Sequence, residues 1–180
     1  RSSKLMPHFH LSLQSGSDRV LAAMRRNYTT AEFLDAVRRA RAVLDDPAFN
    51  TDVIVGFPGE TEASAHRTRN FIKAYDHAAY DGNLSWSMFP FMLAPLSPIY
   101  ESEARKKYGL SGYLHKWKHA TMNSDQARDE LFKTFLEIEN SGPIYRGDNQ
   151  EILQQLGHTV RREFEAVRHK LSKMALGGNL

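Results

Sequence analysis

Apolar and polar residues alternate near the start of the chain, and the alternation then changes to helical spacing. Residues 9–13 alternate with a period of two, which predicts a strand. Residues 17–24 carry an apolar stripe at helical spacing, so a helix is expected directly after the strand. Thr29 and Glu32 form the sequence pattern of a capping box, which predicts that a second helix begins at this point.

The same order of strand, loop and helix is repeated further along. The β-branched run 53–55 predicts a strand buried on both faces. Residues 57–60 have turn composition, and Thr61 is expected to cap a helix that runs through Tyr75. Residues 84–91 alternate again and predict a third strand. Strands that alternate with helices indicate a parallel sheet with right-handed crossovers.

The pattern changes after residue 100, where no further strand is expected. Helices are predicted at 101–107, 110–119, 124–139 and 159–174, with Ser124 as the N-cap of the third. The predicted fold class is therefore α/β. Residues 1–100 are expected to hold the strand and helix repeats, and residues 101–180 a helical C-terminal extension.

Composition places the chain among globular proteins. It has 180 residues, of which 41% are hydrophobic and 25% charged, and its net charge is +3. Lys and Arg are interleaved with acids along the predicted helices, so nucleic-acid binding is not indicated. With no apolar run of membrane-spanning length and no secretory signal in this sequence, we expect a cytoplasmic protein. The first residue is Arg1 rather than Met, and we expect the chain to continue a larger polypeptide.

The chain contains no cysteine. This excludes disulfides, thiolate nucleophiles, thiolate zinc sites and Cys-ligated iron–sulfur clusters within it.

Three loops follow the predicted strands, at residues 14–17, 56–60 and 89–96. Ligands of parallel α/β proteins bind at the carboxyl ends of the strands, so these loops are the candidate site. Glycines at 16, 56 and 59 would let a ligand approach the backbone closely, although tight strand-to-helix turns would need them equally.

Two more specific functions of these loops, as a P-loop and as a nucleophile elbow, are not supported by the sequence. Residues 56–61 lack the Lys of a phosphate-binding P-loop, and Glu60 would repel a phosphate. Residues 14–17 do not have the spacing of a nucleophile elbow.

Two histidine pairs have spacings that would allow both members to touch one metal ion. They are His8 with His10 on a strand, and His115 with His119 on a predicted helix. No Asp or Glu has a spacing that would identify it as a third metal ligand, so no metal site is predicted. The aromatic stripe of Tyr113 and Trp117 is expected to belong to the core.

Three segments closely resemble the radical S-adenosylmethionine (SAM) superfamily: HLSLQSGSDRVL at 10–21, MRRNYT at 24–29 and TDVIVGFPGETE at 51–62. The resemblance covers roughly residues 8 to 100 and implies the C-terminal half of a partial (β/α)₆ TIM-like barrel, with strands four to six. It also implies SAM bound against a 4Fe–4S cluster, where reductive cleavage gives a 5′-deoxyadenosyl radical.

The resemblance implies polar contacts to SAM from the end of strand four. The matching positions are Ser12, Gln14 and Ser15. An arginine after this strand meets the SAM carboxylate in the family, and Arg25 or Arg26 is the candidate here.

The resemblance further implies an adenine-binding wall at strands five and six. Ile54, Val55 and Gly56 would hold the adenine through backbone and apolar contacts. Phe89 and Phe91, at the end of the next strand, would flank it.

The chain departs from the family in lacking the three-cysteine loop that holds the cluster. The cluster ligands are therefore expected outside this chain, in an N-terminal part of the same polypeptide, and the chain alone is expected to be inactive.

The resemblance leaves the reaction and the substrate open. Residues 108–122 look like cobalamin-binding radical SAM proteins, which implies methyl transfer with a cobalamin domain upstream. The first two motifs look like methylthiotransferases that modify tRNA or a ribosomal protein, but those end in a small β-barrel that is not expected here. A non-catalytic α/β binding module is the third alternative.

Overall fold

A computed structural model describes residues 6–45, 47–78, 84–138 and 142–143, together with single positions between 160 and 174. Its elements along the chain are β1 (His8–His10), α1 (Asp18–Ala23), α2 (Thr30–Val43), β2 (Ala48–Val55), α3 (Glu62–Ala78), β3 (Leu84–Pro90), the 3₁₀-helix η1 (Pro98–Tyr100), α4 (Ser102–Tyr108), β4 (Ser111–Tyr113), β5 (Lys116–His119), β6 (Met122–Asn123), α5 (Ser124–Glu137) and β7 (Gly142–Pro143).

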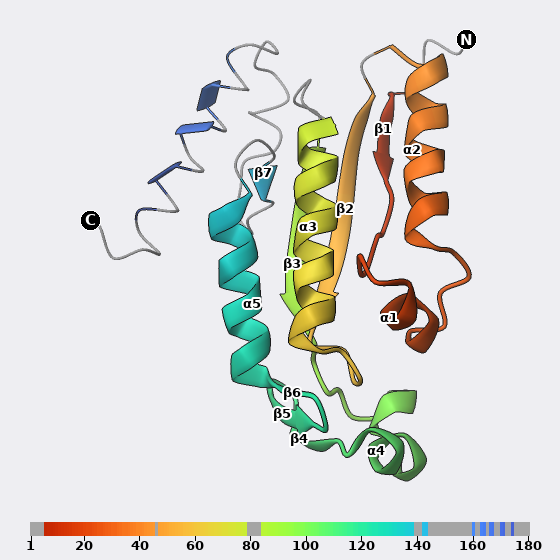
Figure 1. The fold of residues 1–180 in the computed structure, drawn as a ribbon, viewed down its shortest axis with the longest axis vertical. Helices are drawn as coiled ribbons and strands as arrows, with labels where there is room; N and C mark the ends of the chain where they lie inside the picture. Colours follow the sequence, from red (N-terminus) through yellow and green to blue (C-terminus); the bar gives the residue numbers. More distant parts are fainter. Residues whose placement is uncertain are drawn as a thin grey trace.

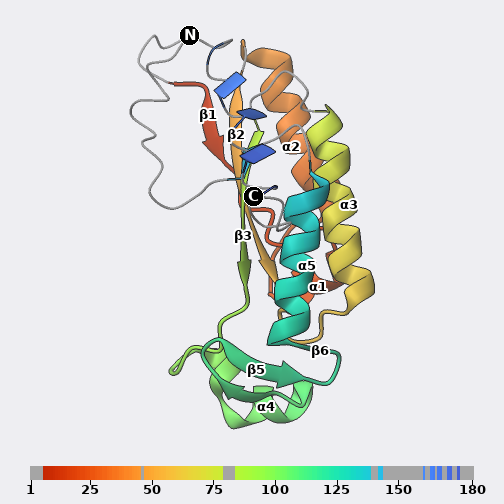
Figure 2. The same ribbon diagram turned by 90° about the vertical axis from the view of Figure 1, so that its left-hand side faces the viewer.

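The large sheet is parallel, with the strand order β1-β2-β3-β7. The helices α2, α3 and α5 all lie on one face of it (Figures 1 and 2). No described helix covers the opposite face, which we call the bare face. The prediction of an α/β fold with a parallel sheet is therefore confirmed.

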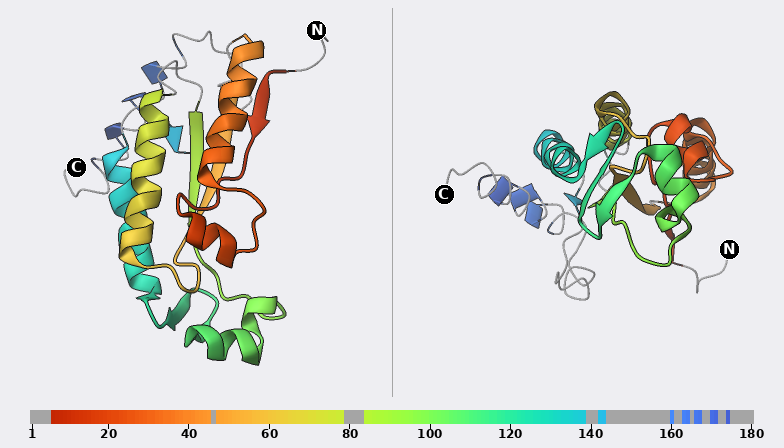
Figure 3. Two further views of the ribbon diagram at one scale, coloured as in Figure 1. Left: turned by 45° about the vertical axis from the view of Figure 1, so that its right-hand side comes forward. Right: turned by 90° about the horizontal axis from the view of Figure 1, so that it is seen from below.

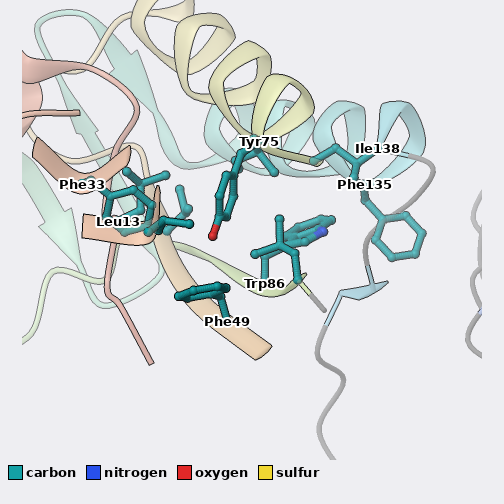
Figure 4. Packing of buried hydrophobic residues seen from close by; sticks show 11 residues of the cluster. Leu13, Phe33, Phe49, Tyr75, Trp86, Phe135 and Ile138 are labelled. Carbon is teal, nitrogen blue, oxygen red and sulfur yellow. The ribbon is translucent and has the colours of Figure 1, made fainter. Parts of the chain in front are cut away.

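The main hydrophobic cluster lies between the large sheet and these helices (Figure 4). Its buried residues come from both layers: Leu13, Phe33, Val37, Phe49, Val53, Ile72, Tyr75, Leu84, Trp86, Phe135 and Ile138. Phe33 makes edge-to-face contacts with Phe71 and Tyr75, with ring centroids 6.1 and 6.0 Å apart. Such aromatic pairs add to the burial of apolar area that holds the layers together.

A second hydrophobic cluster lies at the end of the large sheet where β2 and β3 end. It joins these strand ends to a three-stranded antiparallel sheet, β4-β5-β6, which we call the small sheet. The small sheet and α4 lie below the large sheet in Figure 1, and Figure 3 shows them from that end.

The helix predicted over 110–119 is wrong, because this segment forms β4 and β5. Gly112 and Leu114 adopt positive φ values of 98° and 48°, which a helix does not allow. In β5 the buried residues Trp117 and His119 alternate with exposed lysines, which is the period of a strand.

Two smaller predictions also differ from the structure. The second strand begins at Ala48 rather than at residue 53, and its residues alternate between buried and half-buried. The N-cap of α5 is Asn123 rather than Ser124. The Asn123 side chain accepts hydrogen bonds from the backbone N–H groups of Asp125 and Gln126, so it satisfies two donors that the helix leaves free.

The predicted helix over 159–174 lies largely outside the described residues. The positions that are described there are helical, and their apolar side chains are exposed: Val160, Phe164, Val167, Leu171 and Met174. Within the described part of the chain, no helix is both long enough and apolar enough to cross a membrane.

Candidate functional site

The carboxyl ends of β2 and β3 lie together at the edge of the large sheet that faces the small sheet, whereas β1 ends further from this edge, at His10 beside Asn50 (Figure 1). Beyond β1, the chain stays in register with β2 through a bridge between Gln14 and Val53. Gln14 N donates to Asp52 O at 2.7 Å, and Ile54 N donates to Gln14 O at 2.9 Å. These backbone bonds bring the predicted site loops 14–17 and 56–60 side by side.

The bare face carries a polar network. His10 Nε2 lies 3.0 Å from Asp52 Oδ2 and 3.2 Å from Ser12 Oγ. Asn50, the register partner of His10 on β2, accepts a hydrogen bond from Ser85 Oγ. Ser12 therefore lies on the bare face, and its contact to SAM stays a prediction.

An apolar pair follows this network at the strand ends. Ile54 and Phe89 are register partners on β2 and β3. Phe89 is 50% exposed, so its ring is accessible on the bare face. Both were predicted from the resemblance to contact adenine, and the structure places them next to each other.

Gln14 is joined to Ile54 through its backbone O, and its side chain contacts Arg26. Gln14 is held at a positive φ of 63°, and its Oε1 accepts a hydrogen bond from Arg26 Nη2 at 3.2 Å. Of the two predicted arginines, Arg26 is thus the one whose contact to the strand end is seen. Arg25 is exposed and adopts a positive φ of 58° at the end of α1.

Ser15 points away from the bare face. Its Oγ lies 3.3 Å from Thr68 Oγ1 on α3, and Gly16 N donates to the same Thr68 oxygen at 3.0 Å. A Cβ on Gly16 would lie only 2.7 Å from Thr68 Cα. The space at Gly16 was expected to admit a ligand, and it is instead filled by α3.

At Gly56, too, the space that was expected to admit a ligand is filled by another part of the chain. At a φ of 86°, its missing side chain leaves room for the Trp117 ring, whose Cζ2 would lie 2.8 Å from an added Cβ. Gly56 N donates to Glu60 Oε2 at 2.6 Å. The neighbouring Val55 O accepts from Phe91 N at 2.7 Å. These backbone groups, predicted to hold adenine, already have partners within the chain.

Val55 and Phe91 are buried in the second cluster rather than placed on the bare face. Phe91 packs edge to face against Trp117, with ring centroids 5.4 Å apart. Their role at the site stays a prediction, and in this structure their side chains join the two sheets.

Two buried ionisable groups lie beside these loops. Burial raises the pKa of Glu60 to about 7, against the lowering effect of its hydrogen bond from Gly56. Burial lowers the pKa of His119, although the hydrogen bond from its Nε2 to Gly56 O, 3.3 Å long, acts in the opposite direction. His119 Nδ1 accepts from Thr121 N at 3.3 Å, which fits a neutral ring protonated at Nε2.

The predicted histidine pair of the 115–119 segment does not lie on a helix. His115 is exposed, whereas His119 is buried and stacked on Trp117. Among the residues that the structure describes, no group of three metal-ligating side chains is found.

The residues that sequence reasoning missed are Trp117, His119 and Thr121, which contact the strand-end loops from the small sheet. Trp117 is in the core as predicted, but its contacts to the site were not expected, and Tyr113, predicted with it to be in the core, is exposed on β4. The alternation in residues 116–119 is the signal that could have identified a strand there. Nothing in the local sequence indicates which loop that strand would contact.

Comparison with known proteins agrees with the resemblance. Residues 2–72 match the family model described as the radical SAM superfamily. The chain is 40% identical over 154 residues to a threonylcarbamoyladenosine tRNA methylthiotransferase, MtaB, of Treponema pallidum, an alignment that covers 86% of this chain and 30% of the relative.

Two further relatives are named tRNA-2-methylthio-N(6)-dimethylallyladenosine synthase. The protein of Nitrosospira multiformis is 49% identical over 85 residues, which cover 47% of this chain and 17% of the relative. The protein of Nitrosomonas europaea is 32% identical over 166 residues, which cover 88% of this chain and 37% of the relative. In these alignments the chain therefore spans well under half the length of each curated relative.

Proposed function

Because residues 2–72 belong to the radical SAM superfamily, we propose that this chain is part of a methylthiotransferase that acts on tRNA. Its role is to form the wall of the SAM site built from the chain after β1 and the ends of β2 and β3. The large sheet is then one part of a (β/α) barrel, and the bare face lines its interior.

One observation carries the proposal: Ile54, the register partner of the exposed Phe89, donates its backbone N–H to Gln14 O, and the Gln14 amide in turn accepts from the Arg26 guanidinium. SAM combines a flat, uncharged adenine with an amino-acid carboxylate. An exposed aromatic ring stacks on a nucleobase, and the guanidinium of Arg26 pairs with a carboxylate. The residues present therefore fit SAM.

The residues present do not fit a 4Fe–4S cluster, because the chain has no cysteine to hold one. Bound by cysteines outside this chain, such a cluster would supply the electron for reductive cleavage of SAM. We propose that catalysis depends on those cysteines, and that this chain contributes binding and orientation.

The names of the relatives favour methylthiolation of tRNA over cobalamin-dependent methyl transfer. A cobalamin requirement, and a ribosomal protein as the substrate, stay predictions without support from these relatives. If the chain acts on tRNA, the charge distribution alone gave the wrong expectation, since it did not indicate nucleic-acid binding.

Ligand binding by the 180-residue chain tests the SAM site. Isothermal titration with S-adenosylhomocysteine, a stable analogue, should show binding that Phe89→Ala and Arg26→Ala each weaken. Asp35→Ala is the control, because Asp35 is exposed on α2 and pairs with Arg39 of the same helix. A chain that binds no analogue, or that binds equally well after both changes, would favour the non-catalytic binding module.

The reaction is tested by a chimera. Residues 2–138 replace the matching segment of the Treponema pallidum MtaB, and the tRNA product is analysed by mass spectrometry. A methylthio group on the tRNA supports the proposal. Transfer of a methyl group alone, dependent on added cobalamin, would instead support the cobalamin alternative.

A further inference from the structure

The small sheet contacts the candidate site through the carbonyl groups of the strand-end loops. Trp117 Nε1 donates to Phe91 O at 2.7 Å, and Phe91 N donates in turn to Val55 O at 2.7 Å. The Trp117 ring also fills the space left by the missing side chain of Gly56. One side chain of the small sheet therefore fixes the ends of both β2 and β3.

Two more residues bind the loop 56–60: His119 of β5, and Thr121 of the turn between β5 and β6. His119 Nε2 donates to Gly56 O at 3.3 Å, and Thr121 Oγ1 donates to Glu60 O at 2.5 Å. The His119 ring is stacked on Trp117, with centroids 5.3 Å apart and planes inclined by 4°. The first and last residues of this loop are thus both held from the same side.

The loop after β3 is fastened separately. Leu93 and Leu114 exchange two backbone hydrogen bonds, with N to O distances of 2.9 and 3.0 Å. Leu93 is fully buried, so water does not compete for these bonds.

We propose that the small sheet is a positioning unit for the SAM site, and that Trp117 and His119 are its positioning residues. This inference rests on the proposed function. Val55 follows Ile54 directly and Phe91 lies two residues after Phe89, so the backbone groups that are held are within two residues of the apolar pair. Displacing either strand end would change the spacing of the two side chains that face the ligand.

Trp117 and His119 act through these loops and not by touching the ligand. Both are buried in the second cluster or against it, with 4% and 7% of their surface exposed. A displacement of the loops by about 1 Å is enough to weaken a preorganised site, which is why such support matters.

The test uses the 180-residue chain in two measurements. The first is amide exchange by NMR at Gly56 and Phe91, whose N–H groups donate to Glu60 and Val55. The second is the dissociation constant for S-adenosylhomocysteine. Trp117→Phe, which keeps an aromatic ring and loses the Nε1 donor, and His119→Leu should each exchange about tenfold faster at these amides and bind several-fold more weakly.

Two control variants separate positioning from general stability. Lys118→Ala lies between the two residues on β5 and is exposed, so it should leave both measurements unchanged. Ile72→Val destabilises the main cluster and should lower the melting temperature without changing the affinity at temperatures where the chain is folded.

Each remaining outcome is decisive. Unchanged exchange in both variants would show that the small sheet does not hold the loops. Faster exchange with unaltered affinity would show that its role is structural only. Absence of binding by the unaltered chain would remove the proposed SAM site, and with it the ligand for which the loops are positioned.

Discussion

Tyr75 and Trp86 bring polar atoms into the main cluster, and neither Tyr75 Oη nor Trp86 Nε1 has a hydrogen-bond partner among the described residues. Figure 4 shows both side chains within the cluster, with the Tyr75 oxygen directed into it. Burial raises the pKa of Tyr75 to about 12. A buried hydroxyl without a partner lowers stability because it has lost its bonds to water.

Removing this hydroxyl should therefore stabilise the chain. We expect Tyr75→Phe to raise the free energy of unfolding by about 1 kcal/mol. The matched change Tyr28→Phe should lower it by about 1 kcal/mol, because the Tyr28 hydroxyl donates to Ser12 O at 2.6 Å. Urea denaturation of both variants measures the difference. A loss of stability in Tyr75→Phe would mean that the hydroxyl has a partner, such as an ordered water.

Glu60 should make stability depend on pH. The pKa of the Glu60 carboxyl rises from 4.5 to about 7 on folding. Between these two pH values the carboxyl is protonated in the folded chain and ionised in the unfolded chain. Its contribution to stability is therefore full below pH 4.5 and is lost as the pH rises towards 7.

Glu60→Gln should remove this dependence. Between pH 4 and 8 the variant should gain on the order of 3 kcal/mol relative to the unaltered chain, by the conversion of a pKa shift into free energy. Denaturation across that range measures it, and other titrating groups cancel in the difference. A constant difference at all pH values would contradict a raised pKa for Glu60.

The sequence predicted residue positions best where the alternation along a strand determines on which face of the sheet a side chain lies. Ile54 and Phe89 reach the bare face because alternation in neighbouring parallel strands brings them into register. Ser15 and Gly56 were expected to contact a ligand. Instead, Ser15 contacts Thr68 on α3, and the Trp117 ring packs against Gly56. Those contacts join residues more than fifty positions apart, and no local pattern records them.

At the scale of elements, an ion-pair network joins α3 to α5. Arg69 Nη1 lies 2.8 Å from Glu130 Oε2, and both side chains are buried. Glu130 also accepts from Lys133 Nζ at 2.7 Å, and Glu137 lies 3.3 Å from Arg69 Nε. A buried charge that loses its partner costs far more than an exposed one.

Glu130→Ala should therefore lower the free energy of unfolding by about 3–5 kcal/mol, since Arg69 loses its nearest carboxylate. The double variant Arg69→Met with Glu130→Leu should recover most of this loss. Asp35→Ala, which breaks an exposed pair with Arg39, should cost less than about 0.5 kcal/mol. Thermal unfolding of the three proteins compares them, and equal losses in the single and double variants would contradict the argument.

Some helices and strands could be predicted from the sequence, and others could not. The helices α2 and α3 were found because capping residues and an apolar stripe mark them within their own sequence. The strands β4 and β5 were missed because they are only three and four residues long, and a short apolar segment fits either period. Their stability comes from packing on β2 and β3, which is information from outside the segment.

At the scale of the whole molecule, the large sheet is covered by described helices on one face only (Figure 2). Purely parallel sheets are usually covered on both faces. The two faces should consequently respond differently to the same substitution.

Phe49 and Phe89 allow that comparison, since they lie on opposite faces and are 1% and 50% exposed. Phe49→Ala should lower the free energy of unfolding by about 3–5 kcal/mol, because it leaves a cavity in the main cluster. Phe89→Ala should change it by less than about 1 kcal/mol. Denaturation in urea measures both. A large loss from Phe89→Ala would show that the bare face is covered in solution.

The chain has two tryptophans, and the packing assigns one to each cluster: Trp86 to the main cluster and Trp117 to the second. Each cluster therefore carries its own fluorophore. Emission from single-tryptophan variants would follow the large sheet and the strand-end loops separately during one unfolding titration. If the Trp117 signal were lost at a lower denaturant concentration than the Trp86 signal, the site would open while the layer that supports it remained folded.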